Sequence, residues 1–332
     1  MSQSSFEPFV LPDIASPFPS AFARRVNPSA LDAEAEVLAL LESIAAPDSL
    51  RFRFDESRLG ELTGRLHHDA PPQGLRLSLL NSALFFLHDD WVAEQHTDGQ
   101  LRGAAELAAA YDRALAAFDG APAAPDDIPL VRITALIGRE LGRFRLPQHA
   151  ERYRAALGDY LHAHLWEVDV QRQGTTPSLT EYRQLRPLVM GVRPLIELLP
   201  PIHGRPVPAH LLDHPAVQAL RGILVNVHYL VNDLYSLVKE MHAERPVNVV
   251  LVMCAEHDLT LQQGVDATAE LIPRETTAYV RLKASLPRLG LAHPALLTHL
   301  TDLEHLVADS VAWHTAAPRY YQSVPSPGMS GT

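Results

Sequence analysis

The chain has 332 residues, of which 47% are hydrophobic and 20% charged, proportions that are ordinary for a globular protein. Its formal net charge of −11 argues against nucleic acid as a partner, because nucleic-acid binding needs a concentrated basic face. The single cysteine, Cys254, excludes an internal disulfide framework and fits a reducing compartment.

Targeting signals are not expected either. No stretch approaches the roughly 18 consecutive apolar residues of a membrane span. The start, "MSQSSFEPFVLPD", lacks the basic region followed by an apolar stretch that marks a signal peptide. We therefore expect a cytoplasmic protein with no membrane span.

After a proline-rich start, the chain has the pattern of a succession of helices. Residues 1–30 are expected to form an extended arm, and Asn27 before Pro28 predicts a helix start with Asn27 as N-cap. Ser178 with Glu181 forms a capping box at a later helix start. Apolar spacing predicts further helices at about 56–67, 74–96, 100–118, 127–143, 147–173, 178–199, 212–242, 246–256, 260–288 and 293–316.

These elements predict an all-α fold. The nearest candidate for a strand, "VNVVLVM", is short, and the predicted helices are joined by short proline-containing loops. We expect one α-helical domain over residues 31–322, with a disordered tail at 323–332.

Polar side chains recur within one apolar helical stretch, "VNDLYSLVKE" at 231–240. Asn232, Ser236 and Glu240 are four residues apart, so on a helix they advance only about 40° per step and form one narrow stripe. Lys239 falls within about 20° of the same line. Amide, hydroxyl and carboxylate oxygens in this arrangement suit a hard cation such as Mg²⁺. The alternative is an amphipathic helix with Lys239 and Glu240 in solvent.

A second acidic group follows the apolar run "ALFFLHDDWVAEQ" at 83–95. Asp90 and Glu94 are one helical turn apart, and Asp89 lies about 100° round from Asp90. Carboxylates near a helix C-terminus oppose the helix dipole and repel one another, and a bound divalent cation would reverse both penalties. The alternative is that they form the solvated end of a helix.

Together the two motifs resemble those of microbial class I terpene synthases. "NDLYSLVKE" is similar to the Asn/Ser/Glu metal motif of that family, and "DDWVAE" resembles the DDxxxE variant of its aspartate-rich motif. The resemblance spans nearly the whole chain and implies an α-helical bundle around a central apolar pocket. Two departures are Pro187, where many relatives have a second arginine, and the absence of a tryptophan around 40–46.

The resemblance also implies roles for individual residues. Three Mg²⁺ ions, with Mn²⁺ as a substitute, would be held by Asp89, Asp90, Glu94, Asn232, Ser236 and Glu240. Arg186, which lies 46 residues before Asn232, would sense diphosphate together with Lys239, Arg319 and Tyr320. Gly191 would lie at a helix break. Phe85, Phe86 and Trp313 are candidates for the wall that stabilises carbocations, although each could equally be an ordinary packing residue.

The implied activity is that of a lyase that ionises and cyclises a prenyl diphosphate and releases diphosphate. We expect farnesyl diphosphate and a sesquiterpene hydrocarbon or alcohol, with geranyl and geranylgeranyl diphosphate left open. A homodimer is also left open.

Two other function classes stay open at this point. A helical metal-dependent phosphohydrolase would use His88 and Asp89 with distant histidines as ligands. Such a site needs imidazoles that converge, and the stripe at 232–240 contains none. A non-catalytic helical binding or scaffold protein would have kept the motifs as relics, against which the intact Asn232, Ser236 and Glu240 argue.

Overall fold

A computed structural model describes residues 9–14, 18, 25–42, 44, 54–55, 58–97, 104–241 and 247–316, with only the backbone at 90, 93–97, 171 and 315–316. The expected tail at 323–332 lies outside the described residues, as does most of the expected arm at 1–30. Among the described helices, none is both long enough and apolar enough to cross a lipid bilayer.

The prediction of an all-α fold is confirmed, since the described residues contain helices and no strand. The helices are α1 (Ala30–Leu41), α3 (Leu59–Leu66), α4 (Pro72–Thr97), α5 (Ala104–Phe118), α6 (Pro129–Gly142), α7 (Pro147–Gln173), α8 (Leu179–Val189), α9 (Val192–His203), α10 (Ala209–Leu212), α11 (Pro215–Met241), α12 (Val249–His257), α13 (Leu261–Ser285), the 3-10 helix η1 (Leu286–Leu289) and α14 (Pro294–Ala316).

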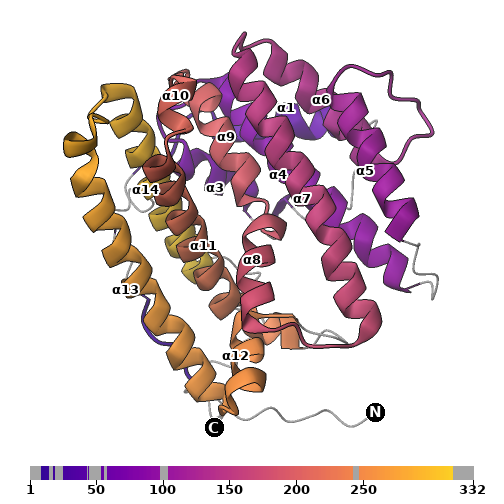
Figure 1. Cartoon of the computed structure of the whole chain (residues 1–332). Helices are drawn as coiled ribbons and strands as arrows, with labels where there is room; N and C mark the ends of the chain where they lie inside the picture. Colours follow the sequence, from indigo (N-terminus) through magenta and orange to yellow (C-terminus); the bar gives the residue numbers. More distant parts are fainter. Residues whose placement is uncertain are drawn as a thin grey trace, which may run out of the picture.

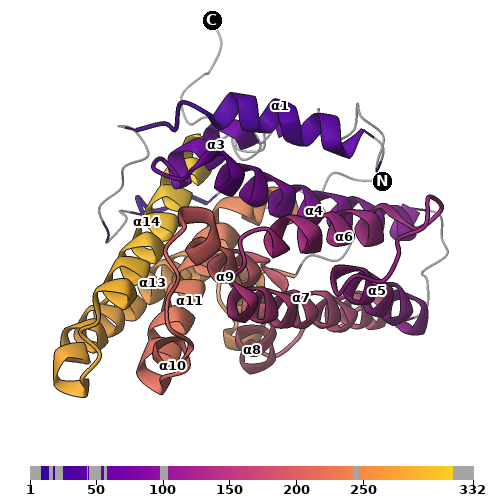
Figure 2. The same ribbon diagram turned by 90° about the horizontal axis from the view of Figure 1, so that it is seen from above.

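The helices form a bundle with two connected apolar cores. In Figures 1 and 2, α11, α13 and α14 form one side and α1, α4, α5 and α6 the other, with α8 and α9 between them. One core lies among α8, α9 and α11–α14, and the other among α1 and α3–α7. Helix α9 joins them, because Ile196 and Leu199 pack into the first core while Leu198 and Ile202 pack into the second.

The region predicted as one helix at 178–199 is two helices. Ser178 accepts a hydrogen bond from the backbone N–H of Glu181, so α8 begins with the predicted capping box. It ends at Val189, and α9 begins after Gly191, whose φ of +70° is left-handed backbone that favours glycine. A Cβ at Gly191 would lie 2.9 Å from Cζ of Phe85, so α4 also packs closely against this break.

Other boundaries also differ from the sequence prediction. The long helix expected at 212–242 is the short α10 followed by α11, which begins at Pro215, and the helix expected at 260–288 ends at Ser285 and continues as η1. Asn27 was predicted to cap the first helix, but α1 has Ser29 at its N-cap and begins at Ala30. The buried Asn27 amide instead donates to the carbonyl oxygens of His67 and Ala70, so it fixes the chain before α1 to the α3–α4 turn.

Candidate active site

The polar stripe of the sequence lies in the C-terminal half of α11. Ser236 is buried, and Asn232 and Glu240 are half-buried. The Ser236 hydroxyl lies 2.7 Å from the backbone oxygen of Asn232, to which it can donate, and its oxygen lone pairs can accept. Lys239, on the same stretch, has an exposed side chain.

A buried carboxylate that the sequence reasoning missed holds this stretch in place. Asp233 is 0% exposed and accepts two hydrogen bonds from Arg186, at 2.9 Å from Nε and 2.6 Å from Nη2. It also accepts the Tyr182 hydroxyl at 2.5 Å and the backbone N–H of Val249 at 3.1 Å. The carboxylate therefore connects α8, α11 and the start of α12.

Arg186, the predicted diphosphate sensor, is held next to the stripe by the same contacts. Its Nη2 also donates to Oδ1 of Asn232 at 3.1 Å. Burial disfavours its charge, but the Asp233 carboxylate and other nearby groups outweigh burial and hold the pKa of Arg186 well above its ordinary value. The guanidinium is therefore a permanent positive charge beside the Asn232 oxygen.

Glu240, at the far end of the stripe, has a second fixed partner. The buried Asn248 donates from Nδ2 to Oε2 of Glu240 and to the backbone oxygen of Asp233, both at 2.8 Å. Its Oδ1 accepts the backbone N–H of Val250, which makes Asn248 the N-cap of α12. Burial and the Asp233 charge raise the pKa of Glu240, while Arg186 and the hydrogen bonds from Asn248 and Ser236 oppose the rise.

The acidic group of the sequence lies near the C-terminal end of α4. Asp89 is exposed, and the side chains of Asp90 and Glu94 lie outside the described residues. One carboxylate oxygen of Asp89 and one ring nitrogen each of His88 and His164 lie within 4.8 Å of one another. His164 lies on α7, and its Nε2 is 3.7 Å from Glu167 on the same helix. The negative charge of Glu167 also contributes to the raised pKa of Arg186. Helix α7 thus links the acidic end of α4 to the stripe on α11.

The His88 contacts bear on the phosphohydrolase alternative. The described residues do bring two imidazoles and a carboxylate together, as that alternative requires. Both nitrogens of the buried His88 ring, however, already lie 3.0 Å from tyrosine hydroxyls, those of Tyr160 and Tyr111. Burial, with a smaller effect of His164, lowers the pKa of His88 well below its ordinary value. A neutral ring held by two hydroxyls acts as a structural bridge between helices.

The candidate pocket aromatics have different surroundings. The Phe85 ring lies against Gly191 at the helix break and makes an edge contact with Tyr160 at 4.8 Å between centroids. Phe86 packs on Phe54 in the core of the α1–α7 side. Trp313, half-buried on α14, lies edge-on to His314 at 5.1 Å. Arg319 and Tyr320, the remaining predicted diphosphate ligands, lie outside the described residues.

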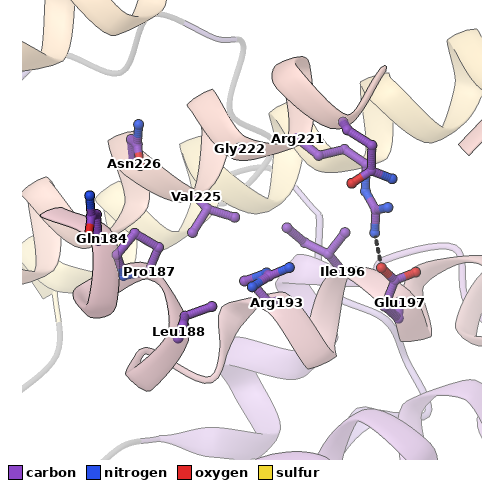
Figure 3. A pocket seen from close by; sticks show the side chains of 11 residues that line it. Gln184, Pro187, Leu188, Arg193, Ile196, Glu197, Arg221, Gly222, Val225 and Asn226 are labelled. Carbon is purple, nitrogen blue, oxygen red and sulfur yellow. Dashed lines mark hydrogen bonds and ion pairs between the residues drawn. The ribbon is translucent and has the colours of Figure 1, made fainter. Parts of the chain in front are cut away.

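A surface pocket of about 260 Å³ lies between α8, α9 and α11. Figure 3 shows Arg193 between Leu188 and Ile196, while Arg221 pairs with Glu197 at one end of the pocket. None of the residues assigned to metal or diphosphate whose side chains the structure describes lines this pocket. We therefore place the chemistry at the polar end of α11.

The donor set at that end of α11 can hold a hard divalent cation. Asn232, Ser236 and Glu240 offer an amide, a hydroxyl and a carboxylate oxygen, without an imidazole or thiolate that would favour a softer metal. The Ser236 hydrogen bond and the Asn248 contact fix two of these oxygens before any ion binds. The exposed Asp89 carboxylate supplies the same kind of ligand from α4.

Comparisons with known proteins agree with this geometry. The family model described as "Terpene synthase family 2, C-terminal metal binding" matches residues 81–277. Pristinol synthase of Streptomyces pristinaespiralis is 29% identical over 320 residues, covering 92% of this chain and 84% of its own. The (+)-T-muurolol synthase of Roseiflexus castenholzii is 29% identical over 276 residues, covering 82% and 83%.

A solved structure shows the same fold. Hedycaryol synthase in complex with HEPES superimposes with a TM-score of 0.78 at 20% identity, covering 93% of this chain and 100% of that one. The family model spans more than half of the chain and includes the C-terminal part of α4 and all of α11. The chain therefore belongs to terpene synthase family 2, and it is an all-α microbial class I terpene synthase.

Proposed function

We propose that this terpene synthase ionises farnesyl diphosphate with three Mg²⁺ ions and cyclises the resulting cation to a sesquiterpene hydrocarbon or alcohol. The observation that carries the proposal is the Arg186 guanidinium, fixed by Asp233 at 2.6 Å and touching Asn232 at 3.1 Å. It places a permanent cation beside the Asn232 oxygen, at one end of the stripe of proposed metal ligands. The net charge of −11 repels an anionic substrate, so fixed cations and bound metal ions at the site have to offset that repulsion.

The choice of substrate is supported by relatives that cover most of the chain. The name of the Roseiflexus castenholzii enzyme states that it cyclises (2E,6E)-farnesyl diphosphate, and so does that of 4-epi-cubebol synthase of Streptosporangium roseum, which is 26% identical over 318 residues. The alternative substrates are geranyl diphosphate, which would fit a shorter pocket, and geranylgeranyl diphosphate, which would fit a longer one.

The residues of this chain have three tasks in the proposed reaction. Asp89, Asp90, Glu94, Asn232, Ser236 and Glu240 hold the ions, which when bound stabilise negative charge on the leaving diphosphate. Arg186, Lys239, Arg319 and Tyr320 contact the diphosphate oxygens and share that charge. Phe85 and Trp313 are the candidates for the wall that excludes water and faces the carbocation with aromatic rings, whereas Phe86 packs on Phe54.

A substrate panel tests the proposal. Purified protein is incubated with Mg²⁺ and geranyl, farnesyl or geranylgeranyl diphosphate, and products are identified by gas chromatography with mass spectrometry. We expect a cyclic C15 product from farnesyl diphosphate, and no product with EDTA. A product from another chain length alone would overturn the substrate assignment. Light scattering on the same preparation tests the homodimer.

Silence with every substrate would contradict the enzymatic assignment. The Asn232→Ala variant is the matched control, because it removes one ligand oxygen from the half-buried stripe and leaves the Asp233–Arg186 pair in place. Turnover at the wild-type rate in this variant would refute the ligand role of Asn232.

A further inference from the structure

An imidazole that neither motif contains faces the first residue of the stripe. His314, on α14, is 1% exposed, and its Nε2 lies 3.1 Å from Nδ2 of Asn232. The two residues are 82 positions apart in sequence and come from neighbouring helices. Asn232 therefore has one partner at each end of its amide group, His314 at the nitrogen and Arg186 at the oxygen.

The backbone of α14 decides which ring nitrogen of His314 carries the proton. Nδ1 lies 2.7 Å from the backbone oxygen of Ser310, and a carbonyl oxygen can only accept. Nδ1 must therefore be the N–H donor. In the neutral ring Nε2 then has a lone pair and no proton, so it can only accept.

This tautomer has a consequence for Asn232. The two ends of a side-chain amide have nearly the same shape but opposite hydrogen-bonding character. A nitrogen that can only accept must face the NH₂ end, so the Asn232 oxygen is directed away from α14 and toward Arg186. A reversed amide would set two acceptors against each other at His314 and turn N–H donors toward the metal side.

The His314 ring is itself held against rotation. Ring contacts surround it, with Trp313 edge-on at 5.1 Å, Tyr235 tilted at 5.8 Å and His228 edge-on at 6.3 Å between centroids. Burial lowers the pKa of His228 to about 3, so the His228 ring beside His314 carries no charge at neutral pH. The His314 ring therefore keeps one orientation, and its Nε2 can orient the Asn232 amide.

We infer that His314 is a positioning residue that keeps the Asn232 amide oxygen turned toward the metal, acting through the hydrogen bond between its Nε2 and the Asn232 NH₂ group. This inference rests on the proposed metal role of Asn232. Positioning partners of metal ligands typically contribute about 10-fold to 100-fold in metal affinity. The effect of losing His314 should therefore show as a higher Mg²⁺ requirement.

The experiment measures metal binding without turnover. The probe is Mg²⁺ titrated at a fixed concentration of inorganic pyrophosphate, and the readout is the Mg²⁺ concentration that gives half of the thermal stabilisation. His314→Phe keeps an aromatic ring but removes the acceptor, whereas His314→Gln provides an oxygen that can accept from Asn232. His305→Phe is the matched control, with the same substitution on a half-buried histidine of α14 two and a half turns earlier.

We expect the half-saturating Mg²⁺ concentration to rise about tenfold in His314→Phe, and to stay within about threefold of wild type in His314→Gln and His305→Phe. An unchanged value in His314→Phe would overturn the inference, as would an equal rise in all three variants. If the wild type shows no Mg²⁺-dependent response to pyrophosphate, the proposed metal site itself fails.

A crystal structure of the wild type with Mg²⁺ and pyrophosphate covers the case in which His314→Phe does not fold. We expect Oδ1 of Asn232 on the metal and its Nδ2 within hydrogen-bond distance of His314. A metal-bound Asn232 with no contact to His314 would overturn the inference while leaving the proposed function intact.

Discussion

The two metal motifs of this terpene synthase are built differently. The stripe on α11 is fixed by partners from three other segments, namely Arg186 on α8, Asn248 before α12 and His314 on α14. Asp89 on α4 is exposed, and what is rigid there is the neighbouring His88, buried between two tyrosine hydroxyls. The proposed ligands on α11 are therefore held in place by hydrogen bonds, whereas the proposed ligand Asp89 on α4 is exposed beside the buried His88.

The largest expected effect separates the two motifs by activity. We expect Asn232→Ala to lower kcat/KM by roughly 10³-fold, because it removes an oriented ligand that no neighbour replaces. Asp89→Asn should cost less, roughly 10²-fold, because Asp90 and Glu94 on the same helix can take over part of its role. Steady-state kinetics at saturating Mg²⁺ measure both. A larger loss of kcat/KM in Asp89→Asn than in Asn232→Ala would mean that catalysis depends more on the α4 motif than on the α11 stripe.

The polar stripe on α11 could be predicted from the sequence because a spacing of four residues places Asn232, Ser236 and Glu240 on one helix face. Their supporting partners could not be predicted. Asn248 and His314 reach the stripe from segments whose placement depends on the whole bundle, and nothing in their local sequence marks the contact. Asp233 lies within the motif itself, but its side chain points about 100° away from Asn232, and its buried role appears only with α8 in place.

The helices show the same division between local and tertiary information. The capping box at Ser178 depends on residues three apart and was predicted correctly. The division of the expected helix at 178–199 into α8 and α9 depends on the backbone of Gly191 and on its packing against Phe85 of α4. Apolar spacing alone predicts one continuous helix there, and the break at Gly191 was expected only from the family resemblance.

The second prediction compares the stability of the two regions. Asp233→Asn should lower the free energy of unfolding by about 3 kcal/mol, because it leaves the buried Arg186 guanidinium without its carboxylate. Asp89→Asn, the same change on the exposed carboxylate of α4, should change it by less than about 0.5 kcal/mol. Urea unfolding of both variants gives the two values. Equal losses would show that the Asp89 carboxylate contributes as much to the stability of the fold as the Asp233 carboxylate does.

The third prediction concerns acid sensitivity on the α4 side. Because the pKa of His88 is well below its ordinary value in the folded protein, the unfolded chain binds a proton at that residue below about pH 6.5 and the folded protein does not. Stability is therefore lost as the pH falls, by up to about 1.4 kcal/mol per pH unit for this residue.

Urea unfolding at pH 7, 6 and 5 measures this contribution. His88→Phe should be less stable than wild type at pH 7, since it breaks two hydrogen bonds, and should lose less stability on acidification. The exposed His210→Phe serves as the control and should follow the wild-type pH profile. An unchanged pH slope in His88→Phe would mean that other groups control the acid response.

The smallest expected effect distinguishes the aromatic residues next to the two motifs. Trp313→Ala, beside His314 on the α11 side, should change the product distribution from farnesyl diphosphate while total turnover falls no more than about fivefold, because one ring contributes about 1 kcal/mol to a passing cation. Phe86→Ala, on the α4 side, should lower the free energy of unfolding by about 2 kcal/mol through lost packing on Phe54 and leave the product ratios unchanged. Product ratios by gas chromatography and stability by urea unfolding separate the two outcomes. If Phe86→Ala shifts the products and Trp313→Ala does not, the wall that shapes the cation belongs to α4, and the preorganised helix α11 serves the diphosphate alone.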